Sequence, residues 1–489
     1  MMNGLNILPS YTDYFSLTTT TLALNTASVW LGGCIAGFFA GQMTDIIGRK
    51  NAMLAAGLLT VFAAILQTAS QNIAMFVSAR ILIGVGTGIS GCTGPTYLAE
   101  TLPYEWRAWG LGAFYDVWYV GGLIAAGVTY GTAGMTSTWA WRTPSALQGL
   151  FSILSIILLP FIPESPRWLA YKGRNSEALE VVALTYANGD NNDPVVLAQY
   201  KEIIDTLKFE RENGETLSIM QTIKTPGARR RLLLACSCGI ATIVSGNNII
   251  SYYLGSMLDN AGITDTTTQL EINIILNAWC LVIAIIGTYF MDRWGRKALA
   301  LLSTGLLIIF IFMIGGLTAG FGNSQNISGI YGTVAAIFLF QGSYSFGWTP
   351  LSVLYPPEVL NYSIRSNGMG VYTLVVNAFG TMVTFAFPYA LAAITWKTYM
   401  INGAWDVLEL LFVWYFWVET KGKTLEEIDE LFDGVKHSDV PDLEAIMKGK
   451  ADIGALVVEG VEVIHSVMLE RALGSKDMDV DVEIIKKID

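Results

Sequence analysis

The stretch Asp45-Ile-Ile-Gly48-Arg49-Lys50 is repeated in the second half of the chain as Asp292-Arg-Trp-Gly295-Arg296-Lys297. In both copies an acid precedes a glycine by three positions, and two cations follow that glycine directly. Each copy lies between long apolar runs, as a short charged connection does between two membrane-spanning helices. This repeat indicates that the chain consists of two homologous halves.

Two further matches support the repeat. Glu164 and Glu419 follow the last apolar run of each half. A Tyr–Glu–Arg motif with constant spacing occurs as Tyr97, Glu100, Arg107 and as Tyr355, Glu358, Arg365. Because the matched motifs fall on the same side of the predicted membrane, the two repeats are parallel, as in the major facilitator fold.

The composition predicts an all-α membrane protein. Hydrophobic residues make up 53% of the chain and charged residues only 14%, whereas soluble proteins carry roughly 25% charged residues. A span needs about 20 mostly apolar residues, and we predict eleven of them. The predicted spans are 17–43, 52–69, 75–98, 109–130, 146–162, 232–254, 270–291, 299–320, 330–355, 366–393 and 399–418.

Lysine and arginine accumulate on one side of these spans, and that side is expected to be cytoplasmic. The opposite side carries only Arg142 and Lys397, together with Asn326, a candidate glycosylation site. We therefore expect a multi-pass protein, in the plasma membrane, with a cytoplasmic tail. The expected units are an N-terminal bundle (1–162), a cytoplasmic loop with short helices (163–231), a six-helix bundle (232–418) and the tail (419–489).

The repeat also predicts that one helix is missing. Two spans precede Asp292 in the second half, but only one precedes Asp45 in the first. We therefore expect eleven of twelve helices, with the first helix absent through an N-terminal truncation.

Several ordered motifs resemble the sugar porter family of the major facilitator superfamily, over nearly the whole chain to about Phe432. They are 41–50, the glycine-rich 79–88, PxYxxExxPxxxR at 95–107, PESPRWL at 163–169, SGNNIISYY at 245–253 and VETKGKTLEE at 418–427. Within the family, the opening residues and 245–254 are most similar to fungal lactose and cellodextrin permeases. The sequence departs from the family at Val418, which replaces a proline, and at Thr242 and Ile243, which replace two glutamines.

The repeated charges predict an inner gate. Cations at a helix C-terminus are favourable to the helix dipole, and simple anchoring of the membrane-flanking cations would account for Arg49 and Lys50. It would not account for a matched acid and glycine in both halves. We expect Asp45 and Glu100 to pair with Arg107 and loop cations. The corresponding second-half pairs would join Asp292 and Glu358 to Arg365. The full predicted gate set is Asp45, Gly48, Arg49, Glu100, Arg107, Asp292, Gly295, Arg296, Glu358 and Arg365, and the resemblance adds Glu164, Arg167 and Glu419.

Two charges fall inside predicted spans, where ionisable residues are costly and are functional candidates. The resemblance implies that Arg80 faces a protonatable aspartate of the first helix, which is absent here. Asp116 lies nearer the inner side, so a direct pair with Arg80 is not favoured. The alternative is that each charge simply faces a water-filled cavity.

Sugar recognition requires amides and hydroxyls for the sugar hydroxyls and aromatic faces for the ring, in a mostly apolar pocket. Asn248 matches the family asparagine of the SGxN motif, and Tyr115 occupies the position of a family glutamine or asparagine. The remaining candidates are Thr242, Ser245, Asn247, Tyr252, Tyr253, Asn273, Asn277, Trp348 and Asn377.

The predicted function is sugar transport by alternating access, driven by protons, with a disaccharide such as lactose or cellobiose, or a hexose, as substrate. The alternatives are a transporter-like sugar sensor and an inactive truncated form. The sequence contains no nucleophile–base set, metal site or phosphate loop, so we expect neither an enzyme nor a cofactor other than the coupling proton. The expected partners are a small sugar and the lipid bilayer, with no nucleic acid and a monomeric chain.

Overall fold

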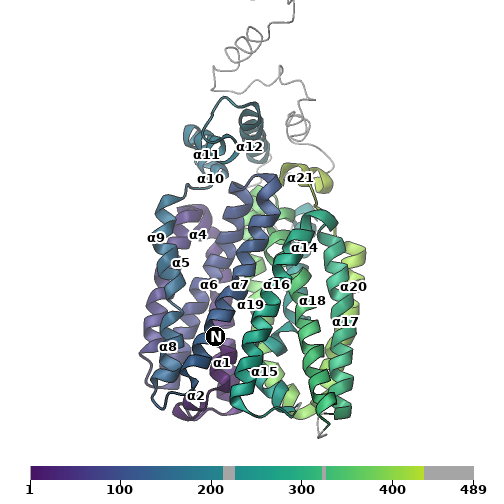
Figure 1. The fold of residues 1–489 in the computed structure, drawn as a ribbon. Helices are drawn as coiled ribbons and strands as arrows, with labels where there is room; N and C mark the ends of the chain where they lie inside the picture. The colour runs from purple at the N-terminus through teal and green to yellow at the C-terminus, as the bar shows by residue number, and fades with distance from the viewer. Residues whose placement is uncertain (1, 213–225, 261, 322–325, 424, 434–489) are drawn as a thin grey trace, which may run out of the picture.

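The computed structural model describes residues 2–212, 226–260, 262–321, 326–423 and 425–433. Within these ranges the chain forms helices and no strand. Figure 1 shows the long helices side by side, with the purple and blue helices of the first half next to the green helices of the second. The predicted tail from residue 434 onward, like 213–225 of the predicted loop, lies outside the described residues.

The first half and the loop that follows it contain helices of unequal length. They are α1 (Met2–Ile7), α2 (Pro9–Tyr14), α3 (Thr19–Gly37), α4 (Ala40–Ile47), α5 (Arg49–Thr68), α6 (Ile73–Thr101), α7 (Tyr104–Ala133), α8 (Trp139–Leu147), α9 (Leu150–Leu158), the 3₁₀ turn η1 (Leu159–Phe161), α10 (Pro166–Tyr171), α11 (Asn175–Ala187) and α12 (Pro194–Glu212).

The second half is built from longer helices. They are α14 (Pro226–Val244), α15 (Asn247–Asn260), α16 (Thr266–Trp294), α17 (Arg296–Phe321), α18 (Ile327–Val359), α19 (Tyr362–Ile394), α20 (Lys397–Phe416) and α21 (Leu425–Asp433).

Every predicted span coincides with one of these helices or with a broken helix. Eight described segments are long and apolar enough to cross a membrane, and the bent pair α3–α4 makes a ninth. Helices α18 and α20 cover the two remaining predicted spans, 330–355 and 399–418, but do not reach that threshold. The break between α14 and α15 lies at Gly246, whose φ of +86° suits a residue without a Cβ atom.

The helices α1 and α2 are not predicted by the sequence analysis. Their side chains Leu5, Leu8 and Tyr11 are buried in an apolar cluster with Phe76 and Trp141. Helix α1 also packs on α7, α15 and α16, which brings the N-terminal residues between the two halves. The start of the chain is thus part of the folded core.

The two halves meet mainly along two helix pairs, α3 with α19 and α7 with α16. Glycines permit these approaches, since a Cβ atom on Gly37 would meet the Leu374 backbone and one on Gly112 would meet Thr288. Small residues at helix contacts are the usual means of close packing in membranes. The loop helices α10–α12 and the helix α21 lie at one end of the bundle (Figure 1), which we call the motif end because both charge motifs lie there.

Candidate functional site

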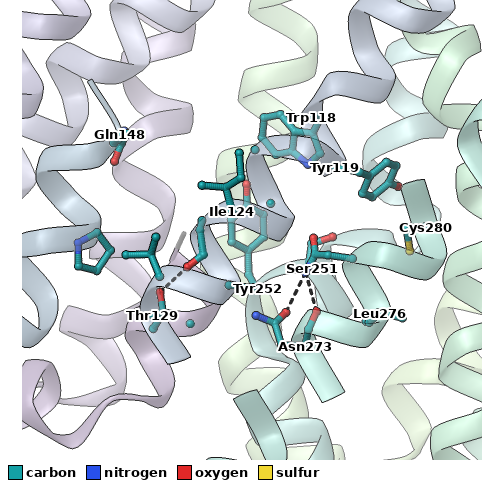
Figure 2. Close-up of a pocket in the computed structure, with 18 of the residues that line it drawn as sticks. Trp118, Tyr119, Ile124, Thr129, Gln148, Ser251, Tyr252, Asn273, Leu276 and Cys280 are labelled. Carbon is teal, nitrogen blue, oxygen red and sulfur yellow. Dashed lines mark hydrogen bonds between the residues drawn. The ribbon is translucent and has the colours of Figure 1, made fainter. Parts of the chain in front are cut away.

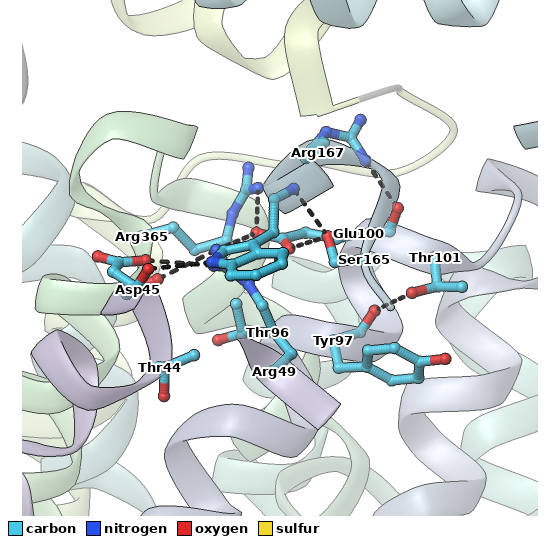
Figure 3. A network of polar contacts seen from close by, with 12 residues as sticks. Thr44, Asp45, Arg49, Thr96, Tyr97, Glu100, Thr101, Ser165, Arg167 and Arg365 are labelled. Atoms are coloured by element: carbon cyan, nitrogen blue, oxygen red, sulfur yellow. Dashed lines mark hydrogen bonds and ion pairs between the residues drawn. The ribbon is translucent and has the colours of Figure 1, made fainter. Parts of the chain in front are cut away.

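The first-half charges form a compact network at the motif end, shown in Figure 3. Arg49 donates to both carboxylate oxygens of Glu100, at 2.9 and 3.0 Å, and lies 3.3 Å from Asp45. The Arg49 and Glu100 side chains are fully buried, whereas that of Asp45 is 40% exposed. We call this group, with Glu164 and Ser165, the first-half cluster.

Gly48 and Glu164 explain why the motif contains a glycine. The Glu164 carboxylate accepts from the backbone N–H groups of Arg49 (3.0 Å) and Lys50 (3.1 Å), at the first residues of α5. An anion at a helix N-terminus is favourable because unpaired N–H groups point toward it. Gly48 has a φ of +91°, and a Cβ atom there would collide with Glu164. Burial raises the pKa of the Glu164 carboxyl, and the backbone donors oppose that shift.

The second-half cluster, consisting of Asp292, Arg296, Glu358, Glu419 and Thr420, repeats this arrangement. Arg296 pairs with Glu358 at 2.9 Å and with Asp292 at 3.1 Å. The Glu419 carboxylate accepts from the backbone N–H groups of Arg296 and Lys297, at 2.8 and 3.0 Å. Gly295, with a φ of +94°, would collide with Glu419 if it carried a Cβ atom.

Two hydroxyl pairs extend the symmetry and were missed by sequence reasoning. Ser165 donates to Glu100 at 2.5 Å, and Thr420 donates to Glu358 at 2.6 Å. The repeated tyrosines also match, because Tyr97 donates to the carbonyl of Pro163 and Tyr355 to that of Val418. The sequence did contain a signal for this pair of hydroxyls, because Ser165 directly follows Glu164 and Thr420 directly follows the matching Glu419.

Contacts between the halves connect the first-half cluster to α19. Arg365 lies 3.5 Å from Glu100, and Arg49 donates to the Ser366 hydroxyl at 3.2 Å. We expected Arg365 to pair with Glu358 and Asp292 of its own half, but the bidentate partner of Glu358 is Arg296. The reason is that Arg365 begins α19, which packs against α3, α4 and α6 of the opposite half.

The other predicted gate arginines are also buried at the motif end. Arg167, in α10, donates to the backbone carbonyl of Glu100 at 3.0 Å, which joins a loop helix to the first-half cluster. Arg107, near the start of α7, is 3% exposed.

A cavity of about 370 Å³ lies between the two halves, lined by residues of α7, α8, α9, α15, α16 and α18. Figure 2 shows Trp118, Tyr119 and Tyr252 around it, with Asn273 on the α16 side. Its polar groups include Tyr119, Gln148, Ser251, Tyr252, Asn273, Asn277 and Gln341. A second, more polar cavity of about 210 Å³, lined by Asn6, Tyr253 and Asp259, shares Tyr252 with the first.

Of the predicted sugar-binding residues, Tyr252, Asn273 and Asn277 line the larger cavity. Asn277 donates to the backbone carbonyl and the side-chain oxygen of Asn273, which orients both amides. Asn247 does not line the cavity, but its side-chain oxygen accepts a hydrogen bond of 2.6 Å from the amide of Gln341, which does. Tyr253 lines the smaller cavity, and its hydroxyl donates to the Thr384 carbonyl.

The other candidates do not line the larger cavity. Trp348 is buried against Trp417 and donates to Thr304, while Tyr115 stacks on Trp118. The Asn248 amide donates to the carbonyl of Ile243, and Asn377 donates to that of Thr373. Thr242 and Ser245 are buried at the end of α14. Sequence reasoning missed Gln341, Tyr119 and Gln148 because no repeated or family motif contains them.

Arg80 and Asp116 do not pair with each other. Arg80 is 4% exposed and donates to the backbone carbonyl of Asn25 at 2.8 Å. It has no acidic partner in the part of the chain that the structure describes. Asp116 accepts from Thr288 of α16 at 2.7 Å, so it joins the two halves. Asn326 is at the other end of the bundle, where its side chain caps α18.

Comparisons with known proteins agree with this architecture. The family described as Sugar (and other) transporter matches residues 5–432. The MFS glucose transporter mfs1 of Aspergillus flavus is 30% identical over 461 residues, covering 88% of this chain and 86% of that protein. The high-affinity glucose transporter of Kluyveromyces lactis is 28% identical over 444 residues, covering 86% and 79%.

Solved structures share the fold. The proton:xylose symporter XylE bound to 6-bromo-6-deoxy-D-glucose is similar with a TM-score of 0.76 and 23% identity, covering 88% of this chain and 97% of that one. An inward-open conformation of XylE from E. coli gives a TM-score of 0.64 at 21% identity, covering 88% and 96%.

The family match, the similarity to an MFS glucose transporter and the long apolar helices together identify a multi-pass membrane transporter of the major facilitator superfamily. The chain belongs to the sugar transporter family of that superfamily. The members of that family that this chain resembles are transporters and not enzymes.

Proposed function

We propose that this transporter carries a hexose across the plasma membrane by alternating access, in symport with protons and with the motif end in the cytoplasm. The observation that carries the proposal is the cavity between the halves, closed toward the motif end by contacts from Arg365 and Arg49 to the opposite half. The lower similarity to inward-open XylE supports this closed state.

The lining of the cavity suits a sugar. Amides of Asn273, Asn277 and Gln341 offer both donors and acceptors, as sugar hydroxyls require. Rings of Trp118 and Tyr252 provide apolar faces for the C–H groups of a pyranose. A hexose is favoured because the glucose transporters of A. flavus and K. lactis are relatives over most of the chain.

Proton coupling is supported by the intramembrane charges. Arg80 and Asp116 are both buried within spans, and Asp116 reaches across the interface between the halves. Ionisable groups in such positions mark ion pathways in many transporters. Protonation of Asp116 would change the charge at a contact that must rearrange when the halves rock.

A disaccharide is the second candidate substrate. It is favoured by the segment 245–254, which resembles that of fungal lactose and cellodextrin permeases.

The test is uptake of labelled sugars by the purified protein in proteoliposomes. We expect saturable uptake of glucose that increases with an inward proton gradient, and loss of uptake in Asn277→Ala. Phe161→Leu, on an exposed residue remote from the cavity, serves as the control. Uptake of lactose or cellobiose without glucose would establish the second candidate. Sugar binding without any uptake would refute transport and establish a sensor.

A further inference from the structure

Helix α20 carries two acids in the middle of a predicted span. Asp406 and Glu409 lie one turn apart, with Asp406 roughly 14 Å and Glu409 roughly 18 Å from the start of the helix and roughly 15 Å and 10 Å from its end, at 1.5 Å per residue. Asp406 is fully buried and Glu409 is 7% exposed. Neither belongs to the charge clusters, the cavity or the Arg80 and Asp116 positions.

These acids have few hydrogen-bond partners. Asn402 donates to one Asp406 oxygen at 3.2 Å. Within the described ranges, the second Asp406 oxygen and both Glu409 oxygens have none. The titratable groups that face Glu409 are Asp406 itself, Cys238 of α14 and Tyr344 of α18.

Within the described part of the chain, no lysine or arginine forms an ion pair with Asp406 or Glu409. Helix α18 contains neither lysine nor arginine. The lysines and arginines of α14, α17 and α19 lie in the first turns of these helices, at the motif end. There Arg231 pairs with Asp429 and Arg296 pairs with Glu358. Lys397 is at the opposite end of α20.

We propose that Asp406 and Glu409 form a proton-binding site in the C-terminal bundle, with Glu409 protonated while the motif end is closed. An ionised carboxylate without donors in an apolar interior is costly, and it becomes neutral by taking up a proton. Because the two carboxyl groups are neighbours, a negative charge on one also disfavours ionisation of the other. On release, the Glu409 O–H bond breaks, the carboxylate keeps the electron pair and the proton passes to water.

The site is connected to the sugar cavity by contacts. Tyr344, which faces Glu409, donates to the carbonyl of Thr242 at 2.9 Å. Asn402, which binds Asp406, lies at the break between α14 and α15, 3.0 Å from where a Cβ atom on Gly246 would be. Asn247, the residue after Gly246, accepts a hydrogen bond from the cavity residue Gln341. Ionisation of the pair would thus act on the helix break beside the cavity.

This coupling rests on the proposed sugar transport, but the protonation can be measured without sugar. Infrared spectra of the reconstituted protein at neutral pH should show a carboxylic-acid C=O band that is lost in Glu409→Gln. The control Glu177→Gln, an exposed acid of α11 outside the predicted spans, should retain the band. An unchanged spectrum in Glu409→Gln would overturn the site. If that variant is unstable, titration of the band in Asp116→Asn decides, because that variant lacks the other buried acid within a predicted span: a band that remains and titrates supports the pair, and loss of the whole band would overturn it.

A transport measurement tests the coupling. In Glu409→Gln we expect sugar exchange to persist but to lose its dependence on pH, because glutamine mimics the protonated acid. A wild-type pH profile in this variant would overturn the coupling. If the wild-type protein shows the carboxylic-acid band but transports no sugar, the proposed function is refuted and the site is not. If the wild-type protein transports sugar with a dependence on pH but shows no such band, the site is refuted and the proposed function is not.

Discussion

At the level of single residues, the two charge clusters repeat the same arrangement of glutamate, glycine and arginine. In each cluster, a glutamate accepts hydrogen bonds from the first backbone N–H groups of a helix. The glycine directly before that helix, Gly48 or Gly295, leaves room for the glutamate carboxylate. The arginine after the glycine is thereby fixed for a bidentate pair with a buried glutamate, Glu100 or Glu358. Buried pairs of this kind are costly to break because the remaining charge is left without a partner.

Gly48 is required both by its backbone conformation and by the carboxylate beside it. Gly48→Ala should lower the thermal unfolding temperature more than Gly173→Ala does. Both glycines have positive φ, but Gly48, at φ +91° and ψ 163°, lies in a region that essentially only glycine occupies. Gly48 also faces the Glu164 carboxylate, while Gly173 has open space around it. Equal losses in the two variants would show that the Glu164 contact is unimportant.

The buried acid Glu100 should matter far more than an exposed one. Glu100→Gln leaves Arg49 with a weakened pair and is expected to destabilise the protein by about 3–5 kcal/mol. The matched change Glu177→Gln alters a half-exposed pair with Arg174 and should change the stability little, because solvent screens such pairs. Denaturation of both variants in the same detergent measures the difference, and similar values would contradict the burial argument.

The sequence predicted the charged members of both clusters because they repeat with constant spacing. It did not predict that Arg365 contacts Glu100 across the halves, since spacing within one half carries no information on packing between halves. It also did not identify Gln341 as a cavity residue, because a single glutamine in an apolar helix has no distinguishing pattern.

At the level of helices, hydropathy located the helical segments under all eleven predicted spans, of which eight, or nine with the bent pair, are long and apolar enough to cross a membrane. It did not locate the bends. The 52° bend between α3 and α4 interrupts one predicted span, and Gly246 interrupts another. The helices α1 and α2 were missed because they are too short to have a clear periodic signal, and tertiary packing on Trp141 stabilises them.

Helix contacts through glycine can be tested on α16 and α17. Gly287→Ala should separate α16 from α18, because the added Cβ atom would collide with the Phe346 backbone. Overpacking of this kind costs about 1–3 kcal/mol. Gly305→Ala, which faces open space on α17, should be neutral or slightly stabilising, because alanine favours a helix. Thermal unfolding should rank the two variants in that order, and the reverse order would contradict the packing.

At the level of the whole molecule, the structure has one end closed between the halves and a cavity between them. Removal of a contact that exists only in this closed state should change the population of states more than the stability of the fold. Ser366 provides such a contact through Arg49, whereas Ser165 binds Glu100 within one half. Ser366→Ala should therefore favour opening, and Ser165→Ala should mainly lower stability.

The most direct test is the distance between spin labels on Leu184 of α11 and Leu431 of α21, two exposed residues on opposite halves at the motif end. The labels would be placed in a variant without the five native cysteines. We predict two distance populations in lipid, with the longer one increased by sugar and by Ser366→Ala but not by Ser165→Ala. A single distance that neither sugar nor Ser366→Ala changes would contradict alternating access.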